Sequence, residues 1–291
     1  MDNEKNLSFR VTGKWLLAFG VVFGLACQNS TKKVSLPLSA KHAIQLSEIT
    51  RGDVNEVRAG MPVGARLLES LYRNSANPRD DLERVQVLLN RTRDKVQDLR
   101  VAKSTFFAFV DSDGTILRSD RTPDSLSGKN LWATVSGSSE VMKGKTIEIR
   151  GSIPEAAGVR GKADGQWFLL APVVSDNAVR GAYVTGWSWS AYAYRLETAL
   201  RNEQKTVARE SHTKEPLVYV YVVVADKAFG APVSPEINAT AILKEMSKVR
   251  LVGDQVWSTI VDIAGRDFAL SARNAPELGS EVEVAVLRSE T

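Results

Sequence analysis

Cysteine and histidine are scarce in this chain, which has one cysteine, Cys27, and two histidines, His42 and His212, in 291 residues. A single cysteine forms no disulfide within the chain and builds no cysteine-rich metal site. The sequence also lacks a glycine-rich phosphate loop and a serine-glycine elbow near a histidine. We therefore expect a protein that is not an enzyme, with no metal and no cofactor. A hydrolase built on two carboxylates stays open, because such pairs assemble in space.

Clustered positive charge is also missing, although the net charge is +4. The basic residues between positions 79 and 103 alternate with acidic ones, which is typical of a solvated helix face. Binding to nucleic acid needs clustered positive charge, so we expect no nucleic-acid partner. The composition, 43% hydrophobic and 25% charged, is that of a globular protein with room for two modest cores.

The hydrophobic segment near the N-terminus is too short to cross a membrane as a helix. It runs from Trp15 to Cys27 without a charge, which is thirteen residues. A membrane-spanning helix needs about 20 apolar residues, whereas the core of a signal peptide needs about 7–15. The preceding segment leans positive and a polar stretch follows. Residues 1–26 are therefore predicted to be a secretory signal peptide.

The end of this segment, Gly24-Leu25-Ala26-Cys27, resembles the lipobox of bacterial lipoproteins. In that class a diacylglyceryl group joins the cysteine thiol, and cleavage makes the cysteine the new N-terminus. Ala26 and Cys27 fit the motif, while Gly24 and Leu25 depart from its usual leucine and small residue. The resemblance implies lipid attachment at Cys27, a tether over residues 27–39 and a place in the bacterial cell envelope, facing the periplasm or the exterior. A plain exported or membrane-tethered protein is the alternative.

Helical and strand patterns then follow one another twice. Residues 40–103 carry helical periodicity with a break at Met61-Pro62, and residues 104–189 open with the strand, turn and strand of TFFAFVDSDGTILRSD. A connecting helix is predicted over residues 190–213, and residues 214–291 repeat the order of the first module. The predicted fold class is α+β, with N-terminal helices followed by two antiparallel-sheet modules.

Identical residues 100 positions apart indicate a duplication of the sheet module. Gly165, Phe168 and Leu170 open one predicted strand, and Gly265, Phe268 and Leu270 open its counterpart. A glycine also precedes the last strand of each copy, at positions 181 and 279. The order of the elements supports the same duplication.

The motifs FVDSDGTILRSD and GQWFLLAPVVSDNAVRGAYVTGWSW, placed between a helical region and a second sheet module, resemble the double Cache sensor domains. These are the extracytoplasmic, PAS-like ligand-binding regions of bacterial receptors. The resemblance covers about residues 40–290 and implies a membrane-distal module at 104–189 and a membrane-proximal one at 214–291. The arginine-x-tryptophan signature of the amino-acid-binding subgroup is not met, and the nearest candidate is Lys129-Asn130-Leu131-Trp132. The class of ligand therefore stays open.

Candidate ligand-binding residues gather in the distal module. An arginine suits a carboxylate, and aromatic side chains can surround the body of a ligand. Trp167 is predicted to share a strand face with Leu169, and Tyr183 one with Trp187; the second module offers few polar anchors and is expected to be structural or to contact a partner. Each aromatic residue also fits a simpler role in the core. The predicted ligand-binding residues are Arg118, Asp120, Trp132, Arg160, Trp167, Tyr183 and Trp187.

Two functions follow from this sequence. The first is a lipoprotein of the cell envelope that binds a small molecule and signals through a partner protein, because no output domain is recognised. The second is an interaction scaffold or accessory subunit of an envelope complex that binds no small ligand.

Replacing Cys27 by alanine is expected to release the protein from the membrane fraction or to leave it unprocessed, because the thiol is the predicted point of lipid attachment. Cell fractionation and gel mobility of the C27A variant beside the wild type measure this. Unchanged size together with unchanged fractionation would contradict lipidation.

Overall fold

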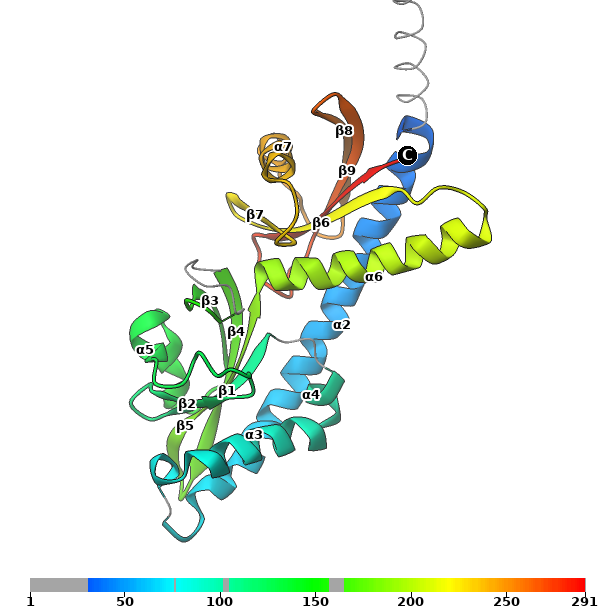
Figure 1. Cartoon of the computed structure of the whole chain (residues 1–291). Coiled ribbons are helices and arrows are strands. Elements are labelled where there is room, and N and C mark those ends of the chain that lie inside the picture. The colour runs from blue at the N-terminus through cyan, green and yellow to red at the C-terminus, as the bar shows by residue number, and fades with distance from the viewer. Residues whose placement is uncertain (1–30, 76, 102–104, 157–164, 291) are drawn as a thin grey trace, which may run out of the picture.

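One long helix carries two sheets that follow each other along it (Figure 1). The computed structural model describes residues 31–75, 77–101, 105–156 and 165–290. The predicted signal peptide, Cys27 and Arg160 lie outside the described residues. No helix in the described part of the chain is long and apolar enough to span a membrane.

The two sheets have the same plan, so the predicted α+β class with two antiparallel modules is confirmed. Their strand orders are β2-β1-β5-β4-β3 and β7-β6-β10-β9-β8, with every neighbouring pair antiparallel. The first sheet consists of β1 (Phe106–Asp111), β2 (Ile116–Ser119), β3 (Ile147–Ser152), β4 (Gly165–Ser175) and β5 (Ala178–Ser188). The second consists of β6 (Leu217–Val224), β7 (Lys227–Gly230), β8 (Val256–Ile263), β9 (Arg266–Asn274) and β10 (Val282–Ser289).

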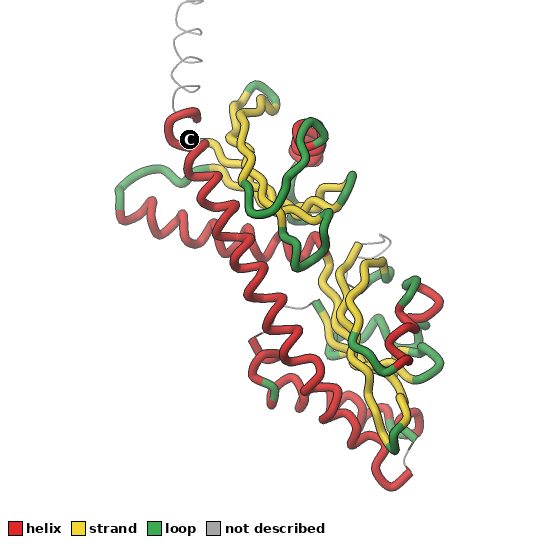
Figure 2. The backbone as a smooth tube through the Cα atoms, turned by 180° about the vertical axis from the view of Figure 1, so that it is seen from behind, coloured by secondary structure: helices red, strands yellow, loops and turns green. Residues whose placement is uncertain are grey.

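Helices cover both sheets. The described helices are η1 (Thr31–Ser35), α2 (Leu36–Leu68), η2 (Glu69–Ser75), η3 (Pro78–Asp80), α3 (Leu82–Lys95), α4 (Gln97–Val101), α5 (Leu131–Thr134), η4 (Ser138–Lys143), α6 (Trp189–Glu210) and α7 (Glu236–Met246). The same faces of both sheets lie against α2, joined by α3 in the distal module and by α6 in the proximal one (Figure 2). On the other faces, α5, η4 and loops cover the first sheet and α7 covers the second.

The predicted break at Met61-Pro62 is wrong, because α2 continues through Pro62 to Leu68. A proline inside a helix removes one backbone hydrogen bond and costs about 3 kcal/mol. Tertiary packing offsets that cost: Met61 and Leu68 are both fully buried in the core between α2 and the first sheet. At 33 residues, α2 is about 50 Å long and passes both sheets.

Within the predicted tether, residues 31–39 are helical. Ser39 lies inside α2, and its hydroxyl is 2.7 Å from the Ser271 hydroxyl on β9. Ser35 donates to the Glu290 carboxylate just beyond β10 at 3.1 Å. The start of α2 therefore belongs to the proximal module.

Two glycines let α2 approach its neighbours closely. A Cβ on Gly64 would stand 2.6 Å from the Tyr183 ring, and one on Gly60 would stand 2.7 Å from the Leu99 side chain. Both distances are shorter than any van der Waals contact, so a larger residue forces the helix away from the sheet or α4. Gly52 of the same helix has no atom within 4 Å of its Cβ position.

The substitution Gly64→Ala is expected to lower the free energy of unfolding by about 1–3 kcal/mol through overpacking. Gly52→Ala is the matched control and is expected to raise it by up to about 1 kcal/mol, because alanine is the better helix former. Urea denaturation of both variants measures the difference. Equal effects of the two substitutions would contradict the close packing of α2 on Tyr183.

A buried polar network joins α2, α6 and β10. The Gln204 amide nitrogen lies 3.2 Å from His42 Nε2, and its oxygen accepts from Arg288 at 2.6 Å. Because an amide nitrogen only donates, His42 Nε2 must be the acceptor and the imidazole is neutral. Burial, followed by the charge of Arg288, lowers the pKa of His42 to about 4.

Stability is expected to fall as the pH drops from about 6.5 towards 4, because His42 takes up a proton more readily in the unfolded chain than in the folded one. Its contribution is complete above the unfolded pKa and is lost as the pH approaches the folded one. Denaturant unfolding at several pH values measures this, with His42→Gln as the comparison. A variant whose stability follows the same pH slope as the wild type would refute the role of His42.

Candidate ligand-binding sites

The three aromatic candidates of the distal strands face the helices rather than the covering loops. Trp167, Tyr183 and Trp187 are each at most 1% exposed and belong to the core that surrounds α2. The rings of Trp167 and Trp187 are 5.1 Å apart, and Trp187 stacks on Tyr192 of α6 at 4.6 Å. The structure thus brings these residues together as packing residues, the simpler role that the sequence also allowed.

Asp120 and Arg118 form hydrogen bonds with different residues of the distal module. The Asp120 carboxylate accepts from the Phe107 backbone N–H at 2.7 Å and from Arg93 of α3 at 2.6 Å. Burial raises the pKa of Asp120, and these two donors oppose that rise. Arg118 donates instead to the Ser127 hydroxyl at 2.6 Å. The two residues fix β2 to its surroundings and form no pair with each other.

Trp132 supports the turn between β1 and β2. Its indole N–H donates to the Ser112 carbonyl at 3.2 Å. Its ring lies over Gly114, where a Cβ would be 2.4 Å from the ring. Gly114 also has a φ of +91°, so this turn requires glycine for two reasons. Trp132 is only partly buried and lies at the edge of the loop-covered core.

The loop-covered face of the distal sheet is packed with apolar side chains and holds one unsatisfied amide. Gln166, at the start of β4, is fully buried, and within the described ranges neither its amide nitrogen nor its oxygen has a hydrogen-bond partner. Its oxygen is 3.0 Å from the Cβ position of Gly186, so the missing side chain there leaves it room. The buried apolar residues of this face are Phe106, Ala108, Val110, Ile116, Leu126, Leu131, Val135, Val141, Ile153, Ala156, Phe168, Leu170, Ala182 and Val184.

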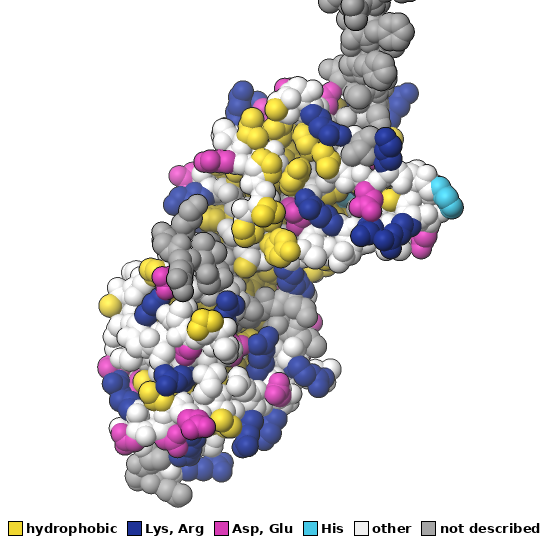
Figure 3. All heavy atoms as spheres, viewed as in Figure 1, with side chains coloured by type: hydrophobic (Ala, Val, Ile, Leu, Met, Phe, Trp, Pro, Cys, Tyr) yellow, Lys and Arg dark blue, Asp and Glu magenta, His cyan; other side chains and the backbone are white. Residues whose placement is uncertain are grey.

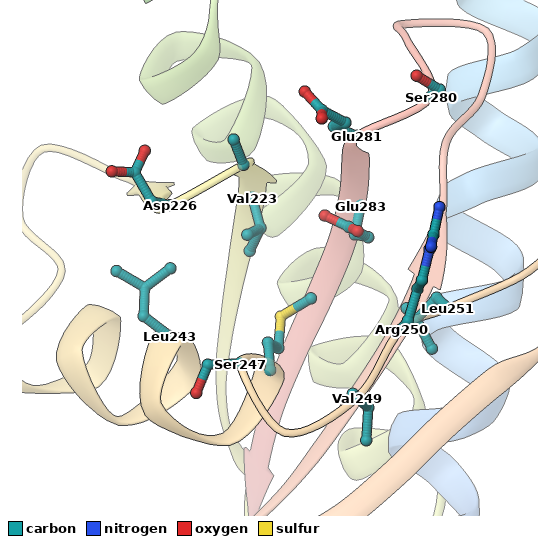
Figure 4. Close-up of a pocket in the computed structure, with 12 residues that line it drawn as sticks. Val223, Asp226, Leu243, Ser247, Val249, Arg250, Leu251, Ser280, Glu281 and Glu283 are labelled. Carbon is teal, nitrogen blue, oxygen red and sulfur yellow. The ribbon is translucent and has the colours of Figure 1, made fainter.

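The corresponding side of the proximal module contains a cavity of about 660 Å³. It lies between α7 and the second sheet, and its walls come from the β6–β7 turn, the end of α7, residues 249–251 and the start of β10 (Figure 4). Glu283 of β10 lines it, and burial raises the pKa of this carboxyl, with a further rise from the neighbouring Glu281. The expectation that this module has few polar anchors therefore does not hold for the cavity.

Neither histidine belongs to these sites: His42 is buried between α2 and α6, and His212 is exposed in the turn after α6. Within the described ranges, no group of three or more histidine, cysteine, aspartate or glutamate side chains is placed to hold a metal ion.

Comparison with solved structures identifies the fold. The domain of a protein assigned to the sensory box/GGDEF family of Vibrio parahaemolyticus is 13% identical with a TM-score of 0.53, over 88% of this chain and 98% of that one. The extracellular domain of a protein described as a histidine kinase is 12% identical with a TM-score of 0.52, over 88% and 92%. An extracellular ligand binding receptor from Desulfohalobium retbaense is 12% identical with a TM-score of 0.51, over 88% of this chain and 40% of that one.

These likenesses concern the fold. No family model matches the sequence, and a search of curated protein sequences found no significant match. The chain spans about two fifths of the length of the Desulfohalobium receptor. The chain shares the fold of these sensor and ligand-binding domains, so the predicted Cache, PAS-like fold is confirmed.

Proposed function

We propose that this chain is a lipid-anchored extracytoplasmic sensor protein that binds a small molecule in its distal module and signals through a partner protein. The single observation that carries the ligand site is Gln166, whose buried amide has no hydrogen-bond partner among the residues that the structure describes. Leaving a buried polar group unpaired costs about 1–3 kcal/mol, so such a group favours a bound molecule that satisfies it. We propose no catalytic role for the chain.

The chemistry around Gln166 favours an uncharged ligand. An amide presents a donor and an acceptor side by side, which complements a carboxamide, a protonated acid or the edge of a nucleobase. Two cations of the distal module already have partners: Lys129 donates to the Pro154 carbonyl at 2.7 Å, and Arg121 donates to the Thr105 carbonyl at 3.0 Å. The other buried side chains on this face of the sheet are apolar, so the body of the ligand is expected to be apolar as well.

The course of α2 supports the proposed orientation. Thr31, four residues after the predicted lipid attachment site, lies beside the second sheet, and α2 carries the chain from there to the first sheet (Figure 1). A lipid on Cys27 would therefore put the proximal module next to the membrane and the distal module away from it.

Exposed apolar side chains support contact with a partner protein. Hydrophobic side chains gather over the proximal module in Figure 3. Near the start of α7, Val233 is 83% exposed and Ile237 is 53% exposed. Exposed apolar patches commonly mark interaction surfaces in soluble domains.

An interaction scaffold without a small ligand is the second candidate function. It is favoured by the loop-covered distal face, where fourteen buried apolar residues fill the space over the sheet. The described residues line cavities elsewhere, in the proximal module, at the junction of the modules and beside the turn between β4 and β5. The effect of replacing Gln166 on the melting temperature and on stabilisation by ligands distinguishes the two functions.

Gln166→Leu is expected to raise the melting temperature of the ligand-free protein, because it removes a buried unsatisfied amide and keeps the volume similar. Gln204→Leu is the matched control and is expected to lower the melting temperature, because the amide of Gln204 has partners in His42 and Arg288. Differential scanning fluorimetry measures both variants.

The same assay tests ligand binding with a panel of carboxamides, amino acids, organic acids and nucleobases. A binder at 100 times its dissociation constant should add about 2.7 kcal/mol of stability to the wild type, and Gln166→Leu should abolish the gain. If no compound stabilises the wild type and Gln166→Leu is destabilised, the distal site is refuted and the scaffold function is favoured.

A further inference from the structure

We propose that the cavity between α7 and the second sheet is a separate binding site for an organic cation with an apolar body, such as a protonated alkylamine or arylamine. This inference does not depend on the distal site, because the two sites share no residue. The cavity has a volume of about 660 Å³, which falls within the range of small-molecule sites in proteins.

The apolar part of such a ligand has a matching wall. Leu243 of α7 lies across the cavity from Val223 of β6 (Figure 4). Met246 of the same helix also lines the cavity. Val249 and Leu251 extend the wall along the segment that follows α7. Burying an alkyl chain or a ring on this surface contributes about 25 cal/mol for each Å² removed from water.

The charges of the lining favour a cation. Asp226, Glu281 and Glu283 supply three carboxylates, and Arg250 supplies the one positive side chain among the lining residues. In Figure 4 the carboxylates of Glu281, just before β10, and of Glu283, on β10, project to the same side, and Arg250 lies across the strand from them. A positively charged group therefore fits on the side where the two carboxylates project.

Glu283 is the strongest anchor for that charge. Glu283 is paired with Val223 in the sheet. It shares one face of β10 with Ala285 and Leu287, whose side chains are buried under α7. No hydrogen bond or ion pair from the described residues reaches its carboxylate, which is half-buried. A carboxylate on an otherwise apolar sheet face, without a partner and beside a cavity, is a binding group for a cation.

The end of α7 adds to the negative potential. The helix ends at Met246, and Met246 and Ser247 both line the cavity. A helix C-terminus carries a partial negative charge and favours cations by about 0.3–1 kcal/mol.

One residue that lines the cavity, Glu281, also forms an ion pair between the two modules. Arg150 on β3 of the distal module lies 3.8 Å from the Glu281 carboxylate at the edge of the cavity. A ligand cation that binds Glu281 competes with Arg150, so occupancy of the cavity changes a contact between the two modules.

Isothermal titration calorimetry of the full chain with 2-phenylethylammonium and with 3-phenylpropanoate tests the proposal. The two probes share a ring and a two-carbon linker and differ in the sign of the charge. The ammonium is expected to bind with a dissociation constant of about 1 mM or tighter. The carboxylate is expected to bind at least about tenfold more weakly, and added salt should weaken the ammonium binding.

Variants place the binding in the cavity. Glu283→Gln is expected to weaken ammonium binding about tenfold, and Leu243→Trp is expected to weaken it by narrowing the cavity at its apolar wall. Glu210→Gln removes an exposed carboxylate at the end of α6 and should leave the affinity unchanged, as should Gln166→Leu. The last control separates failure of this site from failure of the distal site.

Three results would overturn the proposal. They are no heat of binding with the ammonium at about 10 mM, equal affinity for the two probes, and an unchanged affinity in Glu283→Gln with native circular dichroism.

Discussion

The burial of one side of α2 against two sheets is the constraint on which the arrangement of the molecule depends. The buried positions of this helix run from Ser39 to Leu68, so a single stripe of side chains serves both modules. Arg58, near its middle, holds the junction: it donates to both oxygens of Glu148 on β3, at 2.7 and 2.8 Å, and to the Glu277 carbonyl beyond β9 at 2.9 Å. Neither sheet can rotate about the helix without breaking these contacts.

The two sheets have the same topology, but the elements that cover their outer faces differ. In the distal module α5, η4 and their loops place many apolar side chains on the sheet, and Gln166 on this face has no hydrogen-bond partner among the described residues. In the proximal module one helix, α7, covers the sheet, and space remains beside its C-terminal end. Two modules of the same topology thus carry the two proposed sites at different places, one at Gln166 and one beside the end of α7.

The strand patterns could be predicted from the sequence because period-two alternation is a local property. Alternation shows that Tyr183 and Trp187 share a face, but only the path of α2 decides that this face meets helices rather than loops. The continuation of α2 through Pro62 is likewise set by packing on distant strands. Gln166 and Glu283 each interrupt a buried strand with a polar side chain, a local pattern that could have indicated both positions. The cavity itself joins segments about 60 residues apart and has no local pattern.

Strand β10 is the central strand of the second sheet. It is hydrogen-bonded on both edges, to β6 and β9, and is therefore stiff over about 25 Å. Glu281 and Glu283 stand at its beginning, and Glu290, which accepts from Ser35, stands just past its end. Strand β10 therefore joins the edge of the cavity to the beginning of the long helix through one continuous hydrogen-bonded element.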